Sequence, residues 1–117
     1  NASLNRVSPE FIQSDLLANV RARYDLIACN PPYLSDADMR SLQKEVTFEP
    51  AGALHGGADG LDFYRTLAAN AMDYLNPGGA LALEVGFGQA EAVSRLLLKT
   101  ERTRDLNGIE RVVTAFR

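Results

Sequence analysis

The chain has 117 residues, which is at most one domain and is small for an enzyme that binds two substrates. Its net charge of −3 provides no basic field to attract nucleic acid, so we expect no direct nucleic-acid partner. A single cysteine excludes an internal disulfide and a cysteine-rich metal site, and we expect no bound metal.

The remaining composition is that of an ordinary globular protein, with 46% hydrophobic and 23% charged residues. No apolar run reaches membrane length and no signal peptide is present, which predicts a cytoplasmic protein with no membrane partner. The sequence begins with Asn1 and not with methionine, which indicates a fragment, a processed product or a trimmed chain.

The first predicted elements form a strand, a helix and a second strand. Residues 10–15 favour a short strand, and Ser14 or Asp15 can cap a short helix over residues 16–23. Residues 24–29 are apolar and end at a turn signal, which predicts a buried strand of a parallel sheet. This spacing is typical of parallel strands with a right-handed crossover, so the ends of both strands should lie at one edge. Asp15 is then either a helix cap or an acceptor for a nucleotide amino group.

The tetrapeptide Asn30-Pro31-Pro32-Tyr33 follows the second strand, where ligands of open α/β sheets bind. Two adjacent prolines form a stiff segment without N–H groups, and Asn30 adds a side-chain carbonyl acceptor. The ring of Tyr33 can pack on a planar group. Two acceptors and a stacking ring suit a planar amino group with two hydrogens to donate. Cys29, before them, is expected to be a small buried residue beside this site.

A long connection over residues 34–59 separates the tetrapeptide from the next long element, and such loops are usually functional or mobile. Residues 35–45 favour a short helix, and residues 46–50 a brief extended piece. His55 has no carboxylate or second histidine at ligand spacing, so we expect an exposed loop residue and not a catalytic base.

The second half of the chain predicts a helix, a strand, a helix and a hairpin. An apolar face at helical spacing begins at residue 61, and residues 76–79 end that helix. A strand over 80–86 follows, with Glu84 near its end, and then a helix over 89–99. Asn107-Gly108 predicts a hairpin that joins residues 100–106 to 109–116. The expected inward residues of the two helices are Leu61, Tyr64, Leu67, Ala68, Ala71, Leu75, Ala90, Val93, Leu96 and Leu97.

These features together resemble the seven-stranded methyltransferases that use S-adenosylmethionine, in which Asn-Pro-Pro-Tyr marks the enzymes that methylate a planar amino nitrogen. Further blocks resemble the release factor glutamine methyltransferases: residues 48–50 (Phe-Glu-Pro), 59–65 (Asp-Gly-Leu-Asp-Phe-Tyr-Arg) and 83–86 with Gln89. The resemblance implies an α/β fold, namely the C-terminal part of a seven-stranded Rossmann-like methyltransferase with a terminal antiparallel hairpin. Residues 1–117 would then be a partial methyltransferase domain.

The resemblance implies methyl transfer from S-adenosyl-L-methionine to the glutamine side-chain amide in the Gly-Gly-Gln motif of class 1 peptide chain release factors. Asn30, Pro31 and Tyr33 would be the catalytic residues. The cofactor would contact Asp15, Leu16 and Asn30. The substrate would bind the full tetrapeptide and the loop that follows it, through Asn30, Pro31, Pro32, Tyr33, Phe48, Glu49 and Pro50.

Two parts of the family pattern do not appear in this sequence: the N-terminal helical domain and the first two strands, the first with its glycine-rich turn. Gly86-Phe87-Gly88 is a weak match to such a turn because it follows the wrong strand. The sheet would therefore have a gap or exposed edges, and the isolated chain should bind cofactor poorly. Two alternatives stay open: an adenine-N6 nucleic-acid methyltransferase, or a non-catalytic binding module.

Overall fold

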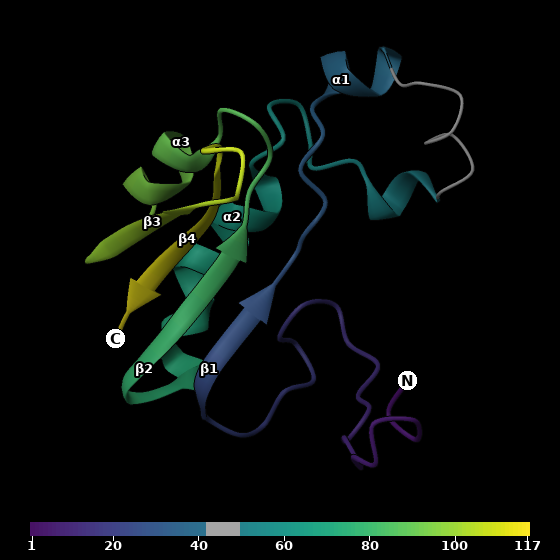
Figure 1. Cartoon of the computed structure of the whole chain (residues 1–117), viewed down its shortest axis with the longest axis vertical. Helices are drawn as coiled ribbons and strands as arrows, with labels where there is room; N and C mark the ends of the chain where they lie inside the picture. Colours follow the sequence, from purple (N-terminus) through teal and green to yellow (C-terminus); the bar gives the residue numbers. More distant parts are fainter. Residues whose placement is uncertain (42–49) are drawn as a thin grey trace.

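The computed structural model describes residues 1–41 and 50–117 and contains one four-stranded sheet (Figure 1). The strands are β1 (Tyr24–Cys29), β2 (Leu75–Glu84), β3 (Thr100–Arg104) and β4 (Glu110–Phe116), in the spatial order β1-β2-β4-β3. β1 and β2 are parallel, whereas β4 is antiparallel to both of its neighbours. The predicted α/β class and the terminal hairpin are confirmed.

The helices are α1 (Asp36–Arg40), α2 (Asp62–Asn70) and α3 (Ala90–Arg95), with 3-10 helices η2 (Ala51–Ala53) and η3 (Ala71–Tyr74). The side chain of Ser35 accepts a hydrogen bond from the Asp38 N–H and so caps α1. α2 and η3 lie between the two parallel strands, where the apolar spacing predicts one helix. The α-helix ends at Asn70, and residues 75–79, which were expected to end the helix and precede the strand, already belong to β2. None of the helices in the described ranges combines the length and the apolar character that a membrane span requires.

The core lies between α2, α3 and one face of the sheet. Side chains of β2 alternate in burial, because Leu81 and Leu83 point toward the helices, and the buried Val85 directly after the strand continues this pattern. Tyr64 and Leu67 of α2 and Val93 of α3 complete this contact. The buried residues that form the hydrophobic core are Tyr64, Leu67, Ala71, Leu75, Leu81, Leu83, Val85, Ala90, Val93 and Val113.

The prediction for residues 10–23 is wrong, because the structure has turns and irregular backbone there. Phe11 is 86% exposed, and no described strand pairs with this segment. Leu16 has φ +46°, in the left-handed region that a right-handed helix cannot contain. Ser14 Oγ accepts a hydrogen bond from the Asn19 N–H, and such local side-chain bonds compete with helix formation. In Figure 1 this segment lies beside the sheet and not within it.

Three further expectations need correction. β1 is not buried: Leu26 is 60% exposed, because β1 is an edge strand with one open face. The helix expected over residues 89–99 ends at Arg95, and Lys99, with φ +51°, turns the chain directly into β3. Leu96 was expected to face inward and is exposed instead. Residues 42–45 of the helix expected over 35–45, and residues 46–49 of the extended piece, lie outside the described residues.

Candidate functional site

The tetrapeptide lies at the carboxyl end of β1, where the sequence placed it. Asn30 is exposed, Pro31 is buried, and Pro32 and Tyr33 are half-buried. The side-chain amide of Asn30 is therefore open to a guest, while the prolines are held by the protein. This combination leaves a polar side chain on a stiff support. The predicted role of these residues as acceptors for an amino group stays a prediction.

The end of the long connection, residues 54–56, forms backbone hydrogen bonds with Leu34, directly after the tetrapeptide. The Leu34 N–H donates to the Leu54 carbonyl at 2.9 Å, and the Gly56 N–H donates to the Leu34 carbonyl at 2.8 Å. Gly56 lies so close that a Cβ there would be 2.7 Å from the Pro32 carbonyl oxygen. Only glycine allows this approach, so the returning loop is packed directly on the tetrapeptide backbone.

The Gln89 side chain also forms a hydrogen bond to the tetrapeptide, and the sequence did not identify this residue as part of the site. Its Nε2 donates to the Tyr33 carbonyl at 2.9 Å and lies 3.5 Å from the Gly60 carbonyl oxygen. Its Oε1 accepts from the Gly86 N–H at 3.0 Å. The signal that could have found it is its position: a half-buried amide in the turn after β2, at the same edge of the sheet as Asn30.

Two titratable groups lie behind the tetrapeptide. The Tyr64 hydroxyl donates to the Glu84 carbonyl at 2.9 Å, and burial, together with nearby Tyr33, raises its pKa far above the ordinary value. Burial also raises the pKa of the Cys29 thiol, which keeps this group neutral. Cys29 thus lies beside the site, as expected, but is half-buried where a buried residue was predicted.

His55 is exposed, as predicted, and the fold gives it a carboxylate partner that is distant in the sequence. Its Nε2 lies 2.7 Å from Asp36 Oδ1. The partner comes from α1, 19 residues earlier, and reaches His55 because the Leu34–His55 bridge aligns the two segments. The contact joins the start of α1 to the returning loop. No group of three or more His, Cys, Asp or Glu side chains in the described residues could hold a metal ion.

A cavity of about 730 Å³ lies between residues 15–18 and α2. Asp15 and Leu16, the expected cofactor residues, form one wall, and the size lies within the range of small-molecule sites. A carboxylate beside a leucine fits the amino group and ring of an adenine. Asn30, the third expected cofactor residue, does not line this cavity, so the structure leaves the tetrapeptide and the cavity as separate features. The other lining residues are Leu17, Ala18, His55, Gly57, Asp62, Phe63, Thr66, Leu67, Asn70 and Tyr74.

Three of the predicted substrate residues lie within residues 42–49, outside the described part of the chain, or directly after them. Phe48 and Glu49 are outside the described residues. Pro50 is exposed and precedes η2 as its N-cap. Their substrate contacts stay predictions.

The Asp59–Arg65 block, which carries much of the family resemblance, has a local structural role. Asp59 Oδ1 accepts from the Leu61 N–H, and the Arg65 guanidinium pairs with both Asp59 and Asp62. Hydrogen bonding to Arg65 lowers the pKa of Asp59. This arrangement forms the turn that begins α2 and places Gly60 beneath the Tyr33 carbonyl.

Comparison with curated proteins found relatives over most of the chain. The release factor glutamine methyltransferase of Geobacter sulfurreducens is 52% identical over 97 residues, which are 78% of this chain and 34% of that protein. The enzyme of the same name from Rhodospirillum rubrum is 47% identical over 113 residues, 92% of this chain and 35% of that protein. The chain thus spans about a third of the length of these relatives. No protein-family model matches the sequence.

Two solved structures have a similar fold. A release-factor-specific protein-(glutamine-N5) methyltransferase from Alicyclobacillus acidocaldarius matches with a TM-score of 0.54 and 30% identity, over 81% of this chain and 49% of that one. A methyltransferase from Pyrococcus furiosus matches with a TM-score of 0.66 over 99% of this chain and 53% of that one. At 20% identity, the second likeness concerns the fold alone. The chain therefore belongs to the release factor glutamine methyltransferase family and has part of its Rossmann-like α/β fold.

Proposed function

We propose that the protein carrying this chain transfers a methyl group from S-adenosyl-L-methionine to a release factor. The acceptor is the side-chain amide nitrogen of glutamine in the Gly-Gly-Gln motif of class 1 peptide chain release factors. The observation that carries the proposal is the tetrapeptide held at the carboxyl end of β1, in a chain 52% identical to a release factor glutamine methyltransferase. Since that partner acts in translation, we place the protein in the cytoplasm.

The tetrapeptide supplies the chemistry that this acceptor needs. An amide nitrogen is a poor nucleophile because its lone pair is delocalised. Asn30 Oδ1 and the Pro31 carbonyl would each accept one amide hydrogen, which orients the nitrogen and stabilises the positive charge that builds there. The half-buried ring of Tyr33 would hold the amide plane. Because positioning supplies much of the rate, no strong general base is needed.

S-adenosyl-L-methionine supplies the methyl group when bound. The carboxylate of Asp15 would accept from the adenine amino group, Leu16 would pack on the ring, and Asn30 would contact the cofactor as well. Asp15 and Leu16 already line one cavity, which supports their part of this assignment. Phe48, Glu49 and Pro50 would line the peptide side of the site.

We further propose that residues 1–117 are the C-terminal part of the catalytic domain, without the N-terminal helical domain and the first two strands. The open edge of β1 supports this assignment, because an apolar edge strand of an α/β sheet is usually covered. The isolated chain should then bind cofactor weakly and turn over slowly. A micromolar affinity for S-adenosyl-L-methionine measured by calorimetry on the 117-residue chain would contradict this.

The test uses the native protein and a purified class 1 release factor. Incubation with S-adenosyl-L-methionine should add one methyl group to the Gly-Gly-Gln peptide, as read by tandem mass spectrometry. Asn30→Ala should lower the rate by about 100-fold, because one of two acceptors at the reacting nitrogen is lost. Asn76→Ala, at the opposite end of the sheet, should leave the rate unchanged. Methylation of an adenine oligonucleotide in place of the release factor, or binding of the release factor without transfer, would overturn the proposal.

A further inference from the structure

We propose that Gln89 is a positioning residue for methyl transfer. Its side chain holds the tetrapeptide in place relative to the turn that follows β2. This inference rests on the proposed function. Gln89 acts through the Tyr33 carbonyl: the described hydrogen bonds of its side chain go to Tyr33, Gly60 and Gly86, and not to Asn30 or Pro31, which are assigned to the reacting amide. Its side chain is half-buried, as suits a structural contact in the protein interior.

The side chain of Gln89 joins three segments that are far apart in the sequence. Tyr33 is 56 residues away and Gly60 is 29 residues away, while Gly86 lies in the turn that follows β2. The donor end of the amide is used at the two carbonyls, and the acceptor end is used at the Gly86 N–H. One planar group therefore fixes the tetrapeptide against both the α2 turn and the β2 edge.

Gly60 and Gly86 lie so close to the Gln89 amide that a larger residue at either position would clash with it. A Cβ at Gly86 would lie 2.7 Å from Gln89 Oε1 and 2.9 Å from the Tyr33 ring. A Cβ at Gly60 would lie 2.7 Å from Gln89 Nε2 and closer still to the Tyr33 carbonyl oxygen. Real side chains essentially never approach so closely. Both glycines thus leave room for one amide that contacts the tetrapeptide.

The choice of glutamine follows from these partners. Two carbonyl oxygens require a donor, and one N–H requires an acceptor, which only an amide side chain of this length offers together. A glutamate would keep the Gly86 contact and place a second oxygen against the two carbonyls. That oxygen would repel the Tyr33 carbonyl and move the tetrapeptide, and a shift near 1 Å costs about 100-fold in rate.

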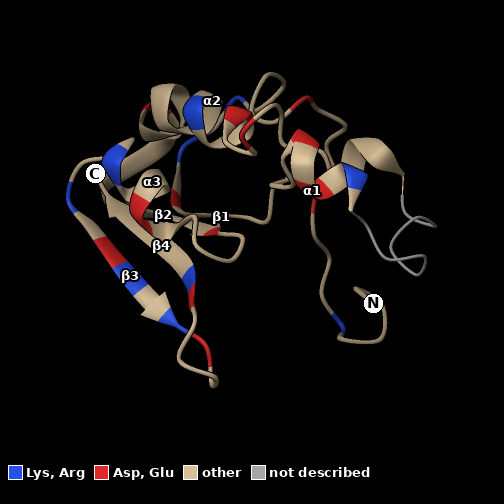
Figure 2. Ribbon diagram, turned by 90° about the horizontal axis from the view of Figure 1, so that it is seen from above, with Lys and Arg blue, Asp and Glu red and all other residues tan. Residues whose placement is uncertain are grey.

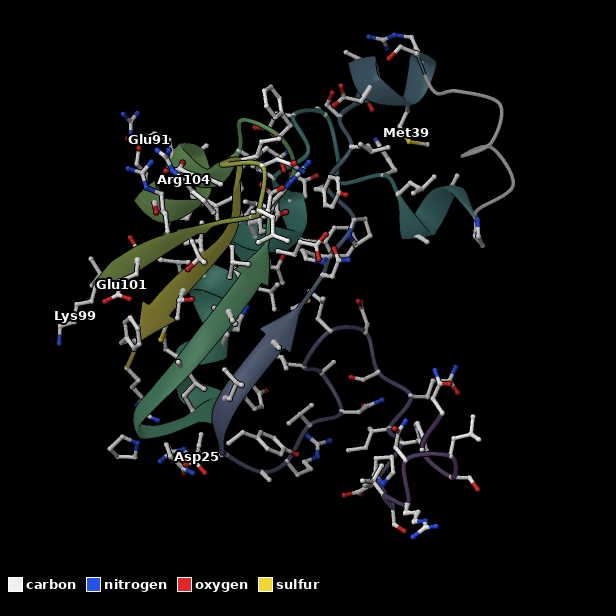
Figure 3. All side chains as sticks on the ribbon, viewed as in Figure 1. Asp25, Met39, Glu91, Lys99, Glu101 and Arg104 are labelled. Carbon is white, nitrogen blue, oxygen red and sulfur yellow. The ribbon has the colours of Figure 1, made fainter. Side chains whose placement is uncertain are left out.

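The control is Asn76, whose side-chain amide also joins two segments by a hydrogen bond, at the other end of the sheet. Its Nδ2 donates to Asp25 Oδ1 at 2.8 Å and so joins β2 to β1. Figure 3 shows Asp25 at the start of β1, far from the strand end that carries the tetrapeptide. Asn76→Asp replaces an amide donor by a carboxylate, as Gln89→Glu does, but without contact to the site.

The experiment compares wild type, Gln89→Glu and Asn76→Asp in the native full-length protein. Steady-state methylation of the release factor gives kcat and KM, thermal unfolding gives stability, and hydrogen exchange is followed in peptides that cover residues 30–36 and 54–58. Gln89→Glu should lower kcat by about 10- to 100-fold with unchanged KM for the release factor, and should speed exchange in both peptides. Asn76→Asp should lower only the unfolding temperature. If Gln89→Glu fails to fold, Gln89→Met, which removes both bonds at similar size, replaces it.

Each outcome decides a different statement. A normal kcat in folded Gln89→Glu or Gln89→Met, with unchanged exchange at residues 30–36, overturns the positioning role. A matching loss of kcat in Asn76→Asp also overturns it, because the effect would then be general destabilisation. If wild type methylates no release factor, the proposed function fails, and the exchange data alone decide whether Gln89 positions the tetrapeptide.

Discussion

The two faces of the sheet differ in what covers them. On one face Leu81, Leu83 and Val113 are fully buried beneath α2 and α3. On the other face Leu26 is 60% exposed and Phe116 is 38% exposed. Leu26 lies on β1 and Phe116 on β4, the two strands that pair with β2. In Figure 1 α2 and α3 lie behind the sheet, and no described element crosses its front.

The open face is still built as an interior surface. Ala80 and Ala82 of β2 lie beside Leu26 and Ala28 of β1 in the parallel register. Small and apolar residues on both faces are typical of a parallel sheet with helices on both sides. The other edge of the sheet is different: the ribbon of β3 in Figure 2 carries both red (Asp, Glu) and blue (Lys, Arg) positions, as expected of an edge that faces water.

The largest expected effect concerns the covered face. Leu83→Ala should lower the free energy of unfolding by about 2 to 5 kcal/mol, because it removes a fully buried side chain and leaves a cavity. Chemical denaturation of the 117-residue chain, followed by circular dichroism, measures this change. A loss as small as that of a surface substitution would mean that α2 and α3 do not pack on this face.

The sequence predicted the parts of the fold whose partners are near in the chain. The hairpin needed only Asn107-Gly108 and two alternating strands, and α2 needed only its apolar spacing. Residues 10–15 show the limit of this reasoning, since a strand exists only when another strand pairs with it. A local pattern cannot show whether that partner is present.

The same distinction applies to the site. The chemistry of Asn30 and the prolines follows from their residue types and from their place after an apolar strand. The contacts of His55 with Asp36 and of Gln89 with Tyr33 depend on how distant segments meet, so residue spacing predicts neither pair. For Gln89 the one signal available was its place in the turn after a strand, which does not identify its partner. Asp59 and Arg65 carry the family resemblance, yet their described contacts are those of a turn and not of a substrate site.

A smaller effect is expected for the buried hydroxyl on the covered face. Tyr64→Phe should cost about 1 to 2 kcal/mol, because it removes the hydrogen bond to the Glu84 carbonyl and leaves that oxygen with fewer partners. Denaturant unfolding at neutral pH measures it. Tyr74→Phe is the matched control, since Tyr74 is only half-buried. Equal losses in both variants would contradict a special role for the Glu84 contact.

A still smaller effect is expected on the open face of the isolated chain. Leu26→Ala should change the free energy of unfolding by at most about 0.5 kcal/mol, as for other surface substitutions. In the native full-length protein the same change should cost more, if another layer covers this face. Equal, small effects in both proteins would mean that the open face is a true surface.

The smallest expected effect concerns the turn that leads into α2, and it depends on pH. The hydrogen bond from Arg65 lowers the pKa of Asp59 in the folded chain, so the charged carboxylate stabilises the fold above its ordinary pKa of about 4. This contribution is lost as the pH falls through the lowered value, because both states are then protonated. The stability difference between wild type and Asp59→Asn should therefore be constant near neutral pH and shrink below about pH 4. Asp73→Asn is the control, because among the described contacts the Asp73 carboxylate forms no ion pair. A difference for Asp59→Asn that stays constant into acid would show that Arg65 holds the turn through Asp62 alone.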